Sequence, residues 1–346
     1  ARDTMSDRAP LLEVEHLSVT FPGDGVPVHA LDDVSFALRE HEVLGVVGES
    51  GSGKTTLALA LLGLLPADAR VDGVIRFRGT DLVGLGDRAL RPLRGDRIAI
   101  VFQDAPAVFN PVMTVGAQVA EAIAVHHAVA DAELRERVVA LLDLVGIPDA
   151  RRRAGQLPYE YSGGMRQRAM IAMAIANDPD VLVADEPTTA LDVTVQAQVL
   201  DVLQRVQERT RSSTVLVTHD LGVVAGIAQR VMVMYAGRQA EVAPVDDLFH
   251  ASRHPYTLGL LASLPRLDDA GARHARLHRI AGQPPSLAHV PAGCPFHPRC
   301  PVARVPGPCD GERPALRDVG PGHASACHFA ETLDVVPLTE PERARS

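Results

Sequence analysis

The run Gly48–Thr55, GESGSGKT, restricts this chain more than any other feature of its sequence. It matches the phosphate-binding pattern G-x-x-x-x-G-K-[ST], it directly follows the apolar stretch Val43–Val47, and helix-forming residues run on from Lys54 to about Leu65. Lys54 is the single lysine among 34 basic residues. A compact ammonium on a flexible stem reaches β- and γ-phosphates inside a nest of backbone N–H groups, where a planar guanidinium fits poorly. The run therefore predicts a strand, a phosphate loop and a helix in that order.

Length and charge narrow the classes of protein to consider. The 346 residues suffice for about two domains, and the formal net charge of −9 argues against a nucleic-acid partner, which needs a basic face. Apolar stretches stay shorter than the roughly 18 residues that span a bilayer, and no charged-then-apolar signal opens the sequence. We therefore expect a cytosolic protein or one held on a membrane by a partner, with residues 1–10 as a disordered lead-in.

Short apolar runs alternate with helical patterns along residues 11–250. Several runs are continuous in Val, Leu and Ile, as in strands buried on both faces of a parallel sheet. The phosphate loop at the end of one such run predicts an α/β fold. The further strands that we expect are Ile98–Phe102, Val181–Ala184, Thr214–Val217 and Arg230–Tyr235.

Helical patterns dominate residues 104–178, which we expect to form a helical insertion. Asp131 fits an N-cap, apolar residues then recur at helical spacing, and Gly146 fits a stop. A second helix is expected over residues 163–177. The basic cluster Arg151–Arg153 is expected to be a solvated loop.

Two further motifs bear on phosphate chemistry. Asp185 and Glu186 end the apolar run VLVADE, so that one carboxylate is able to hold Mg²⁺ and the other to orient an attacking water. The sequence YSGGMRQ, residues 161–167, places a hydroxyl and unobstructed N–H groups before a helix, which is a natural anion site. Together with the phosphate loop, these motifs predict an enzyme that hydrolyses a phosphoanhydride.

The phosphate loop, the SGG segment, Asp185–Glu186, TALD at residues 189–192 and VTHD with His219 together resemble the ATP-binding cassette (ABC) family over about residues 12–250. The resemblance implies a P-loop NTPase core with an antiparallel β edge. It implies Glu186, His219 and Gln103 as catalytic residues, Thr55, Gln103 and Asp185 at Mg²⁺, and Asp192 at a dimer seam. The ATP-binding residues that it implies are Phe21, Gly48, Glu49, Ser50, Gly51, Ser52, Gly53, Lys54, Thr55 and Thr56.

The resemblance also implies a second cassette. In this family the SGG segment, here Ser162, Gly163 and Gly164 with Gln167, acts on the ATP of the opposite subunit. The chain has one phosphate loop and one such segment, so we expect it to need a second ATPase subunit, a homologous but different chain. Tyr161 replaces the leucine usual before SGG.

The C-terminal extension, residues 251–346, changes in texture. HPYTLGLLASLP (254–265), GQPPSL (282–287) and CPFHPRCP (294–301) resemble the extension of ATPase subunits of oligopeptide and dipeptide importers, parts of which are shared by relatives with nickel or oligosaccharide cargo. The resemblance implies two membrane-spanning permease subunits and an extracytoplasmic peptide-binding protein as partners, at the cytoplasmic face of the membrane. A non-transport cassette ATPase is the alternative from another class.

All four cysteines lie in an irregular segment over about residues 284–329. Their spacing lacks the paired knuckles of structural zinc sites, whereas four thiolates with Cys-Pro pairs are compatible with a [4Fe–4S] cluster. The importer resemblance also implies a cluster in some members. Zn²⁺ with His297, His323 or His328 as substitute ligands, and unligated thiols, remain alternatives. The cluster ligands that we expect are Cys294, Cys300, Cys309 and Cys327.

Overall fold

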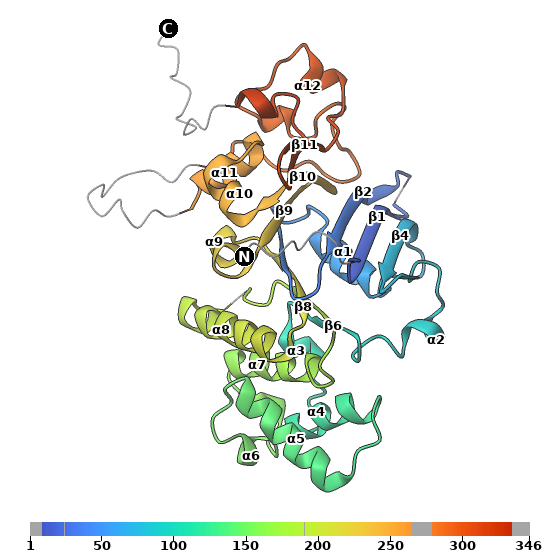
Figure 1. The fold of residues 1–346 in the computed structure, drawn as a ribbon, viewed down its shortest axis with the longest axis vertical. Coiled ribbons are helices and arrows are strands. Elements are labelled where there is room, and N and C mark those ends of the chain that lie inside the picture. Colours follow the sequence, from blue (N-terminus) through green and yellow to red (C-terminus); the bar gives the residue numbers. More distant parts are fainter. Residues whose placement is uncertain (1–8, 24, 190, 265–278, 334–346) are drawn as a thin grey trace, which may run out of the picture.

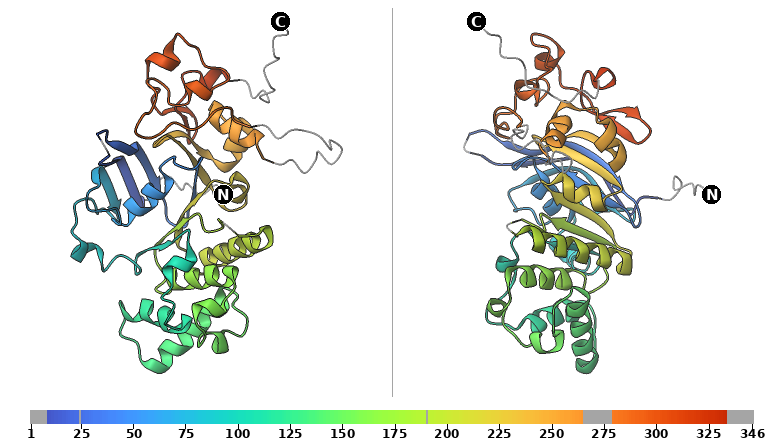
Figure 2. Two further views of the ribbon diagram at one scale, coloured as in Figure 1. Left: turned by 180° about the vertical axis from the view of Figure 1, so that it is seen from behind. Right: turned by 90° about the vertical axis from the view of Figure 1, so that its left-hand side faces the viewer.

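The structure is a computed structural model that describes residues 9–23, 25–189, 191–264 and 279–333. Most of the lead-in predicted for residues 1–10 lies outside the described residues. Three parts are visible in Figure 1: an antiparallel sheet, a central sheet, and a lobe of helices, with the C-terminal extension at the end opposite the lobe. Figure 2 shows the same order from behind.

The antiparallel sheet has four strands in the order β2-β1-β4-β5. It forms the antiparallel edge that the family resemblance implies. Alternating buried and partly exposed residues along β1 and β2 show that one face of each strand packs inward. Its strands are β1 (Leu12–Phe21), β2 (Val28–Leu38), β4 (Arg70–Phe77) and β5 (Thr80–Asp81).

The central sheet has eight strands in the order β11-β12-β10-β9-β3-β8-β7-β6. The strands from β9 to β6 run parallel, and the strands β3, β7 and β8 are buried along their whole length, as their continuous apolar sequences predict. The bounds are β3 (Val43–Val47), β6 (Ile98–Val101), β7 (Val181–Asp185), β8 (Ser213–Thr218), β9 (Arg230–Tyr235), β10 (Arg238–Pro244), β11 (Arg317–Gly320) and β12 (His323–Ser325).

The C-terminal extension continues this sheet. The strand β12 pairs antiparallel with β10, with Glu241 opposite Ser325, and β11 pairs with β12. The sequence predicts an irregular segment here and gives no sign of these two strands, which have four and three residues. Their pairing across about eighty residues joins the extension to the domain that holds the phosphate loop through backbone hydrogen bonds.

The helices α3 to α7 all lie within residues 104–178, where the sequence predicts a helical insertion. The first turn of α5 begins at Asp131 and its N-cap is Ala130, so the N-cap prediction for Asp131 is wrong by one residue. Arg151–Arg153 belong to α6, not to a loop. Helix bounds are α2 (Asp87–Leu90), α3 (Ala105–Val108), α4 (Val115–Ala124), α5 (Asp131–Leu144), α6 (Ala150–Arg153), α7 (Gly163–Ala174), α8 (Val193–Thr210), α9 (Leu221–Ile227), α10 (Val245–Ala251), α11 (Pro255–Ala262) and α12 (Pro308–Gly311).

The helix after the phosphate loop, α1 (Lys54–Leu61), is shorter than the sequence predicts. Gly63 adopts a positive φ of 61°, and the N–H of Leu64 returns to the carbonyl of Leu59 at 2.9 Å. This left-handed turn closes the helix before Leu65 because glycine accepts that conformation without steric cost.

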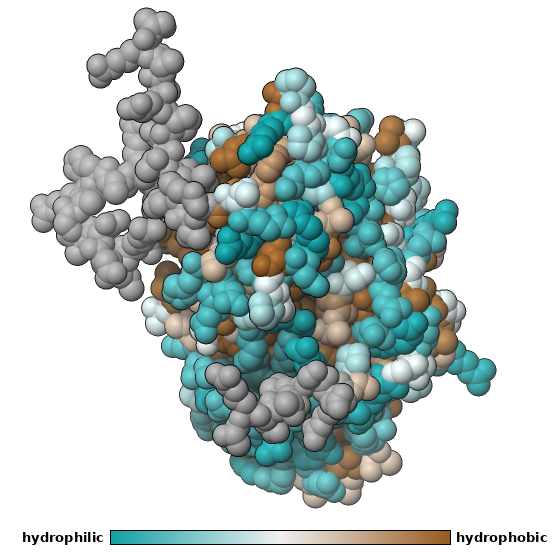
Figure 3. Space-filling model, turned by 45° about the horizontal axis from the view of Figure 1, so that its top comes forward, coloured by the Kyte–Doolittle hydropathy of each residue, from teal (hydrophilic) through white to brown (hydrophobic). Residues whose placement is uncertain are grey.

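Two apolar clusters cover the two faces of the central sheet. In β3, Val43 and Val47 belong to the cluster that includes the helical lobe, whereas Leu44 and Val46 belong to the cluster under the antiparallel sheet. Figure 3 shows a face over the extension on which apolar side chains are scattered among polar ones. Within the described ranges, no helix is both long and apolar enough to cross a membrane.

Gly45 provides a test of this packing. A Cβ added at Gly45 of β3 would lie 2.3 Å from a methyl carbon of Val224 on α9. We expect Gly45→Ala to lower the free energy of unfolding by about 1–3 kcal/mol through overpacking. The matched control is Gly226→Ala on the same helix α9, where a Cβ meets open space and where alanine favours the helix by up to about 1 kcal/mol. Urea unfolding of both variants measures the difference, and equal stability would contradict the close β3–α9 contact.

Candidate functional site

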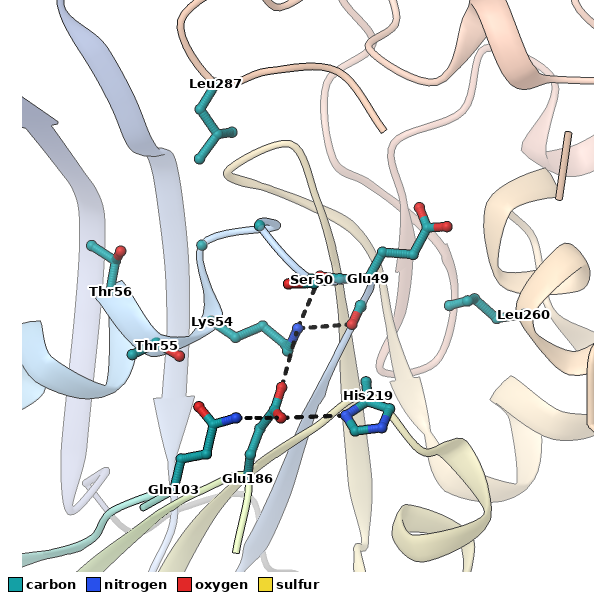
Figure 4. Close-up of a pocket in the computed structure, with 13 residues that line it drawn as sticks. Glu49, Ser50, Lys54, Thr55, Thr56, Gln103, Glu186, His219, Leu260 and Leu287 are labelled. Atoms are coloured by element: carbon teal, nitrogen blue, oxygen red, sulfur yellow. Dashed lines mark hydrogen bonds and ion pairs between the residues drawn. The ribbon is translucent and has the colours of Figure 1, made fainter. Parts of the chain in front are cut away.

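The phosphate loop between β3 and α1 forms one wall of a cavity of about 600 Å³. Side chains from the segments that follow β6, β7 and β8, and from the C-terminal extension, complete it (Figure 4). The sequence predicts most of these positions. The lining residues are Gly48, Glu49, Ser50, Gly51, Gly53, Lys54, Thr55, Thr56, Gln103, Glu186, His219, Leu260 and Leu287.

Lys54 is buried at the centre of this site. Its Nζ donates hydrogen bonds to the carbonyl oxygens of Gly48 and Glu49, at 2.8 and 2.9 Å, and lies 4.0 Å from a carboxylate oxygen of Glu186. Burial lowers the pKa of Lys54, while the neighbouring carboxylates of Glu186 and Asp185 oppose that shift. A poorly hydrated ammonium without a buried ion pair of normal length is well suited to bind an incoming polyanion.

Gly53 shows why the loop is rich in glycine. Its φ is 99°, and a Cβ there would lie 2.4 Å from the carbonyl oxygen of Ala30 on β2. Both the conformation and the close approach exclude a side chain. Gly53, the N-cap of α1, is therefore held directly against the antiparallel sheet.

Asp185 and Thr55 form the candidate magnesium position. The Thr55 hydroxyl donates to an Asp185 carboxylate oxygen at 3.4 Å. Burial raises the pKa of Asp185, and the Thr55 hydrogen bond works in the opposite direction. A hydroxyl and a desolvated carboxylate side by side are the hard oxygen ligands that Mg²⁺ prefers, so the donor set fits that ion.

Glu186 follows β7 directly, with a positive φ of 45°. Its Oε2 accepts a hydrogen bond from the Thr189 hydroxyl at 2.7 Å and from the Gln103 amide at 3.4 Å, and the His219 Nδ1 lies 3.4 Å from the same oxygen. The structure thus brings together the three predicted catalytic residues. Thr189 is a contact that the sequence analysis missed as a site residue, although its place three residues after Glu186, in the motif TALD, could have suggested it.

The SGG segment lies on a different part of the chain from this cavity. Ser162 is the N-cap of α7, and its hydroxyl accepts from the Met165 N–H at 3.3 Å. Asp192 caps α8 in the same way, through the Val195 N–H at 2.9 Å. The described residues Ser162, Gly163, Gly164, Gln167 and Asp192 do not line the cavity at the phosphate loop.

Phe21 and Ser52 are predicted site residues that are absent from the lining of this cavity. Phe21 ends β1, pairs with Val28 and packs against the core cluster under the antiparallel sheet. Ser52 is buried, and its hydroxyl has no hydrogen-bond partner among the described residues. The adenine-stacking role of Phe21 stays a prediction.

The extension contributes two lining residues that the sequence analysis missed, Leu260 from α11 and Leu287. Both belong to segments whose sequences resemble the importer extension but give no local sign of a contact with this cavity. They place apolar surface from the extension beside the phosphate loop in Figure 4.

The four cysteines line one small cavity of about 20 Å³, together with His297 and His328. All four are free thiols. Burial raises the pKa of Cys294, that of Cys300 to about 12 and that of Cys327 to about 11. Across the described ranges, no group of three or more His, Cys, Asp or Glu side chains is arranged to hold a metal ion. The four thiols therefore lie around one cavity, but their spacing is not that of a preformed metal site.

The three candidate histidines have other partners. His297 Nδ1 contacts the carbonyl oxygen of Cys294 at 2.9 Å, and His328 Nε2 contacts that of Glu312 at 2.9 Å. His323 pairs with the buried Glu241 at 2.7 Å and is absent from the residues that line the cysteine cavity. His323 is thus placed away from the thiols that it was expected to supplement.

Two family models match the sequence. One, described as ABC transporter, matches residues 31–189, and the other, described as oligopeptide/dipeptide transporter, C-terminal region, matches residues 240–306. A putative peptide import ATP-binding protein of Brucella abortus is 48% identical over 320 residues, which cover 92% of this chain and 95% of that protein. The chain belongs to the ABC transporter family. Its C-terminal extension is of the oligopeptide/dipeptide transporter type.

Further relatives of this ABC protein are named as oligopeptide transport ATP-binding proteins. The oligopeptide transport ATP-binding protein OppD of Salmonella typhimurium is 47% identical over 317 residues, covering 92% of this chain and 93% of that protein. OppD of Mycobacterium tuberculosis is 53% identical over 326 residues, and the chain spans about half the length of that relative, 53%. A dimeric ATP-binding cassette solved in a post-hydrolysis state with ADP and Pi matches with a TM-score of 0.61 and 26% identity, covering 68% of this chain and 98% of that one.

The start of α7 offers a test of how this ABC protein holds its SGG segment. A Cβ at Gly164 would lie 2.5 Å from a methyl carbon of Val195 on α8, whereas a Cβ at Gly163 would meet nothing within 4 Å. We expect Gly164→Ala to cost about 1–3 kcal/mol of stability. Val195→Ala should relieve that cost, so the double variant should be more stable than the sum of the single effects.

Thermal unfolding of the four variants measures this coupling, with Gly163→Ala as the control that should unfold like the unaltered protein. Additive effects of the Gly164 and Val195 changes would contradict the contact.

Proposed function

We propose that this chain is the ATP-hydrolysing subunit that energises import of di- and oligopeptides through a membrane ABC transporter. The observation that carries the proposal is the cavity in which Lys54, Glu186 and His219 face the same space (Figure 4). The cargo class rests on the C-terminal region and on relatives named as peptide import or oligopeptide transport proteins.

The residues of the cavity divide the chemistry among themselves. Backbone N–H groups of the phosphate loop and the Lys54 ammonium hold the β- and γ-phosphates. Thr55 and Asp185 would hold Mg²⁺, with Gln103 beside them, and that ion would neutralise charge on the phosphates. Phosphoanhydride hydrolysis depends on positioning and charge stabilisation, which these groups provide with little rearrangement.

Glu186 orients and polarises the attacking water. Thr189, Gln103 and His219 meet at one of its carboxylate oxygens, so the side chain is fixed in direction before substrate arrives. His219 is more than half exposed, which leaves it free to contact a γ-phosphate that enters from solvent. Glu186 thus acts as the catalytic carboxylate and His219 as the group that senses the terminal phosphate.

The site needs a second cassette. Ser162 to Gly164 lie at the start of α7 and outside the cavity that this chain's own phosphate loop forms. Two chains arranged head to tail would place each SGG segment on the other chain's nucleotide. We propose a homologous second ATPase chain, two permease subunits and an extracytoplasmic peptide-binding protein as the partners, with this chain at the cytoplasmic face of the membrane.

Replacing Glu186 tests the assigned mechanism. We expect Glu186→Gln to reduce ATP turnover by the reconstituted complex by about 10²-fold or more while ATP binding is retained, because an amide keeps the shape but polarises water poorly. The control is Glu133→Gln, an exposed position in the first turn of α5. Turnover is measured with and without a peptide-loaded binding protein. Undiminished ATP hydrolysis by Glu186→Gln would exclude the catalytic role assigned to Glu186. ATP turnover that does not change when the peptide-loaded binding protein is added would exclude peptides as the cargo.

We propose, as a second function of the extension, that Cys294, Cys300, Cys309 and Cys327 hold a [4Fe–4S] cluster with a structural role. The support is that four free thiols from distant positions converge on one cavity. Binding would have to widen that cavity and remove protons whose loss burial opposes, and cluster assembly couples to such deprotonation.

Chemical analysis decides between the alternatives. We expect iron and acid-labile sulfide in equal amounts in protein purified without oxygen, and their loss in Cys300→Ser together with a lower melting temperature. Ser263→Ala, in the extension but away from the thiols, is the control. If the protein contains zinc and no iron, the four thiols hold zinc and the cluster proposal is wrong. If the protein contains no metal and is fully stable, the thiols are unligated.

A further inference from the structure

Glu49, the second residue of the phosphate loop, makes a bidentate ion pair with Arg299 of the extension. One guanidinium nitrogen lies 2.5 Å from Oε2 and the other 2.9 Å from Oε1. The two residues are 250 positions apart in the chain. Such fork-to-carboxylate pairs fix orientation as well as charge, because both hydrogen bonds must be satisfied by one planar geometry.

Arg299 is itself held firmly. Its side chain is 5% exposed, its Nε donates to the carbonyl oxygen of Ala281 at 2.9 Å, and Nη1 donates to the Tyr235 hydroxyl at 3.3 Å. The guanidinium carbon lies 5.8 Å from the ring centre of Tyr235 and 6.0 Å from that of Phe296. A cation fixed by two rings and a carbonyl loses little further freedom when it binds Glu49.

The backbone of Glu49 is held as well. Its N–H donates to the hydroxyl of Tyr256, a fully buried residue of α11, at 2.8 Å, and its carbonyl accepts from Lys54 Nζ at 2.9 Å. All three polar parts of Glu49 therefore have fixed partners, two of them in the extension. In Figure 4 the Glu49 carboxylate points away from the Lys54 nitrogen, so its contact with Arg299 leaves the phosphate position clear.

We propose that Arg299 is a positioning residue for ATP binding: through Glu49 the extension fixes the conformation in which the phosphate loop receives the nucleotide. Arg299 does not line the nucleotide cavity and acts only through the loop. The proposal rests on the proposed binding of ATP here but not on peptide cargo or on the rate of hydrolysis. It predicts that the loop loses affinity when the extension releases Glu49, while both domains stay folded.

The test is the dissociation constant of a fluorescent ATP analogue with Mg²⁺, measured on the full chain. We expect Arg299→Met and Glu49→Gln each to raise it roughly tenfold, as for loss of a charge-assisted pair. Arg299→Lys should recover part of the loss, because it restores charge without the fork. The double variant Glu49→Gln/Arg299→Met should bind about as weakly as either single variant, since all three lose the same contact.

Two controls make the result specific. Arg304→Met removes a guanidinium that stacks on Phe329 inside the extension, at 4.0 Å, and should bind like the unaltered chain. Lys54→Ala should abolish binding, and if it does not, the proposed nucleotide site itself fails. Melting temperatures establish that each variant is folded, and Glu49→Gln, nearly isosteric and partly exposed, remains informative if Arg299→Met does not fold.

Three outcomes would overturn the proposal. Unchanged affinity in folded Arg299→Met or Glu49→Gln would show that the pair only fastens the extension. Tighter binding by Glu49→Gln would mean that the charge of Glu49, not its position, matters. A roughly hundredfold loss in the double variant would show that the two residues act independently.

Discussion

The buried ammonium of Lys54 is the interaction on which the rest of the site depends. It is held by two carbonyl oxygens of its own loop and faces Glu186 at 4.0 Å, the limit of an ion pair. The loop is thereby closed around a cation whose burial is compensated by dipoles more than by a partner charge. In the function that we propose, the phosphates of ATP supply this missing charge beside Asp185 and Glu186 at the end of β7. The arrangement of β3, α1 and β7 brings these groups together.

The sequence predicted the parts of this arrangement that are local. The strands β3, β7, β8 and β9 are built around apolar runs, and the phosphate loop, Glu186 and His219 directly follow β3, β7 and β8, so parallel pairing brings them to one edge. Errors arose at element ends, where a single residue such as Gly63 or Ala130 decides the boundary. Those choices depend on hydrogen bonds of one turn that periodicity does not resolve.

The role of the extension could not be predicted in the same way. Arg299 is one of many arginines in the sequence, and only the fold places it on Glu49. Leu260 and Leu287 likewise reach the nucleotide cavity through the packing of α11 and the segment after it. The convergence of the cysteines was foreseen from their late clustering, whereas their spacing around the cavity depends on turns that the sequence does not specify. Contacts between distant segments carry no local signature, so their discovery requires the structure.

The pairing of β12 with β10 has a consequence for how the chain is handled. Without residues 317–325, β10 would be the last strand of the central sheet, with the N–H and C=O groups of one side unpaired. The short hairpin replaces that edge by a strand of four residues, two of which are the charged Arg317 and Asp318. The extension thus protects the nucleotide domain from edge-to-edge aggregation. A shortened chain that ends near residue 250 would keep its phosphate loop but expose β10 as an unpaired edge strand. Poor solubility of such a fragment would therefore result from the uncovered sheet edge and would say nothing about nucleotide binding.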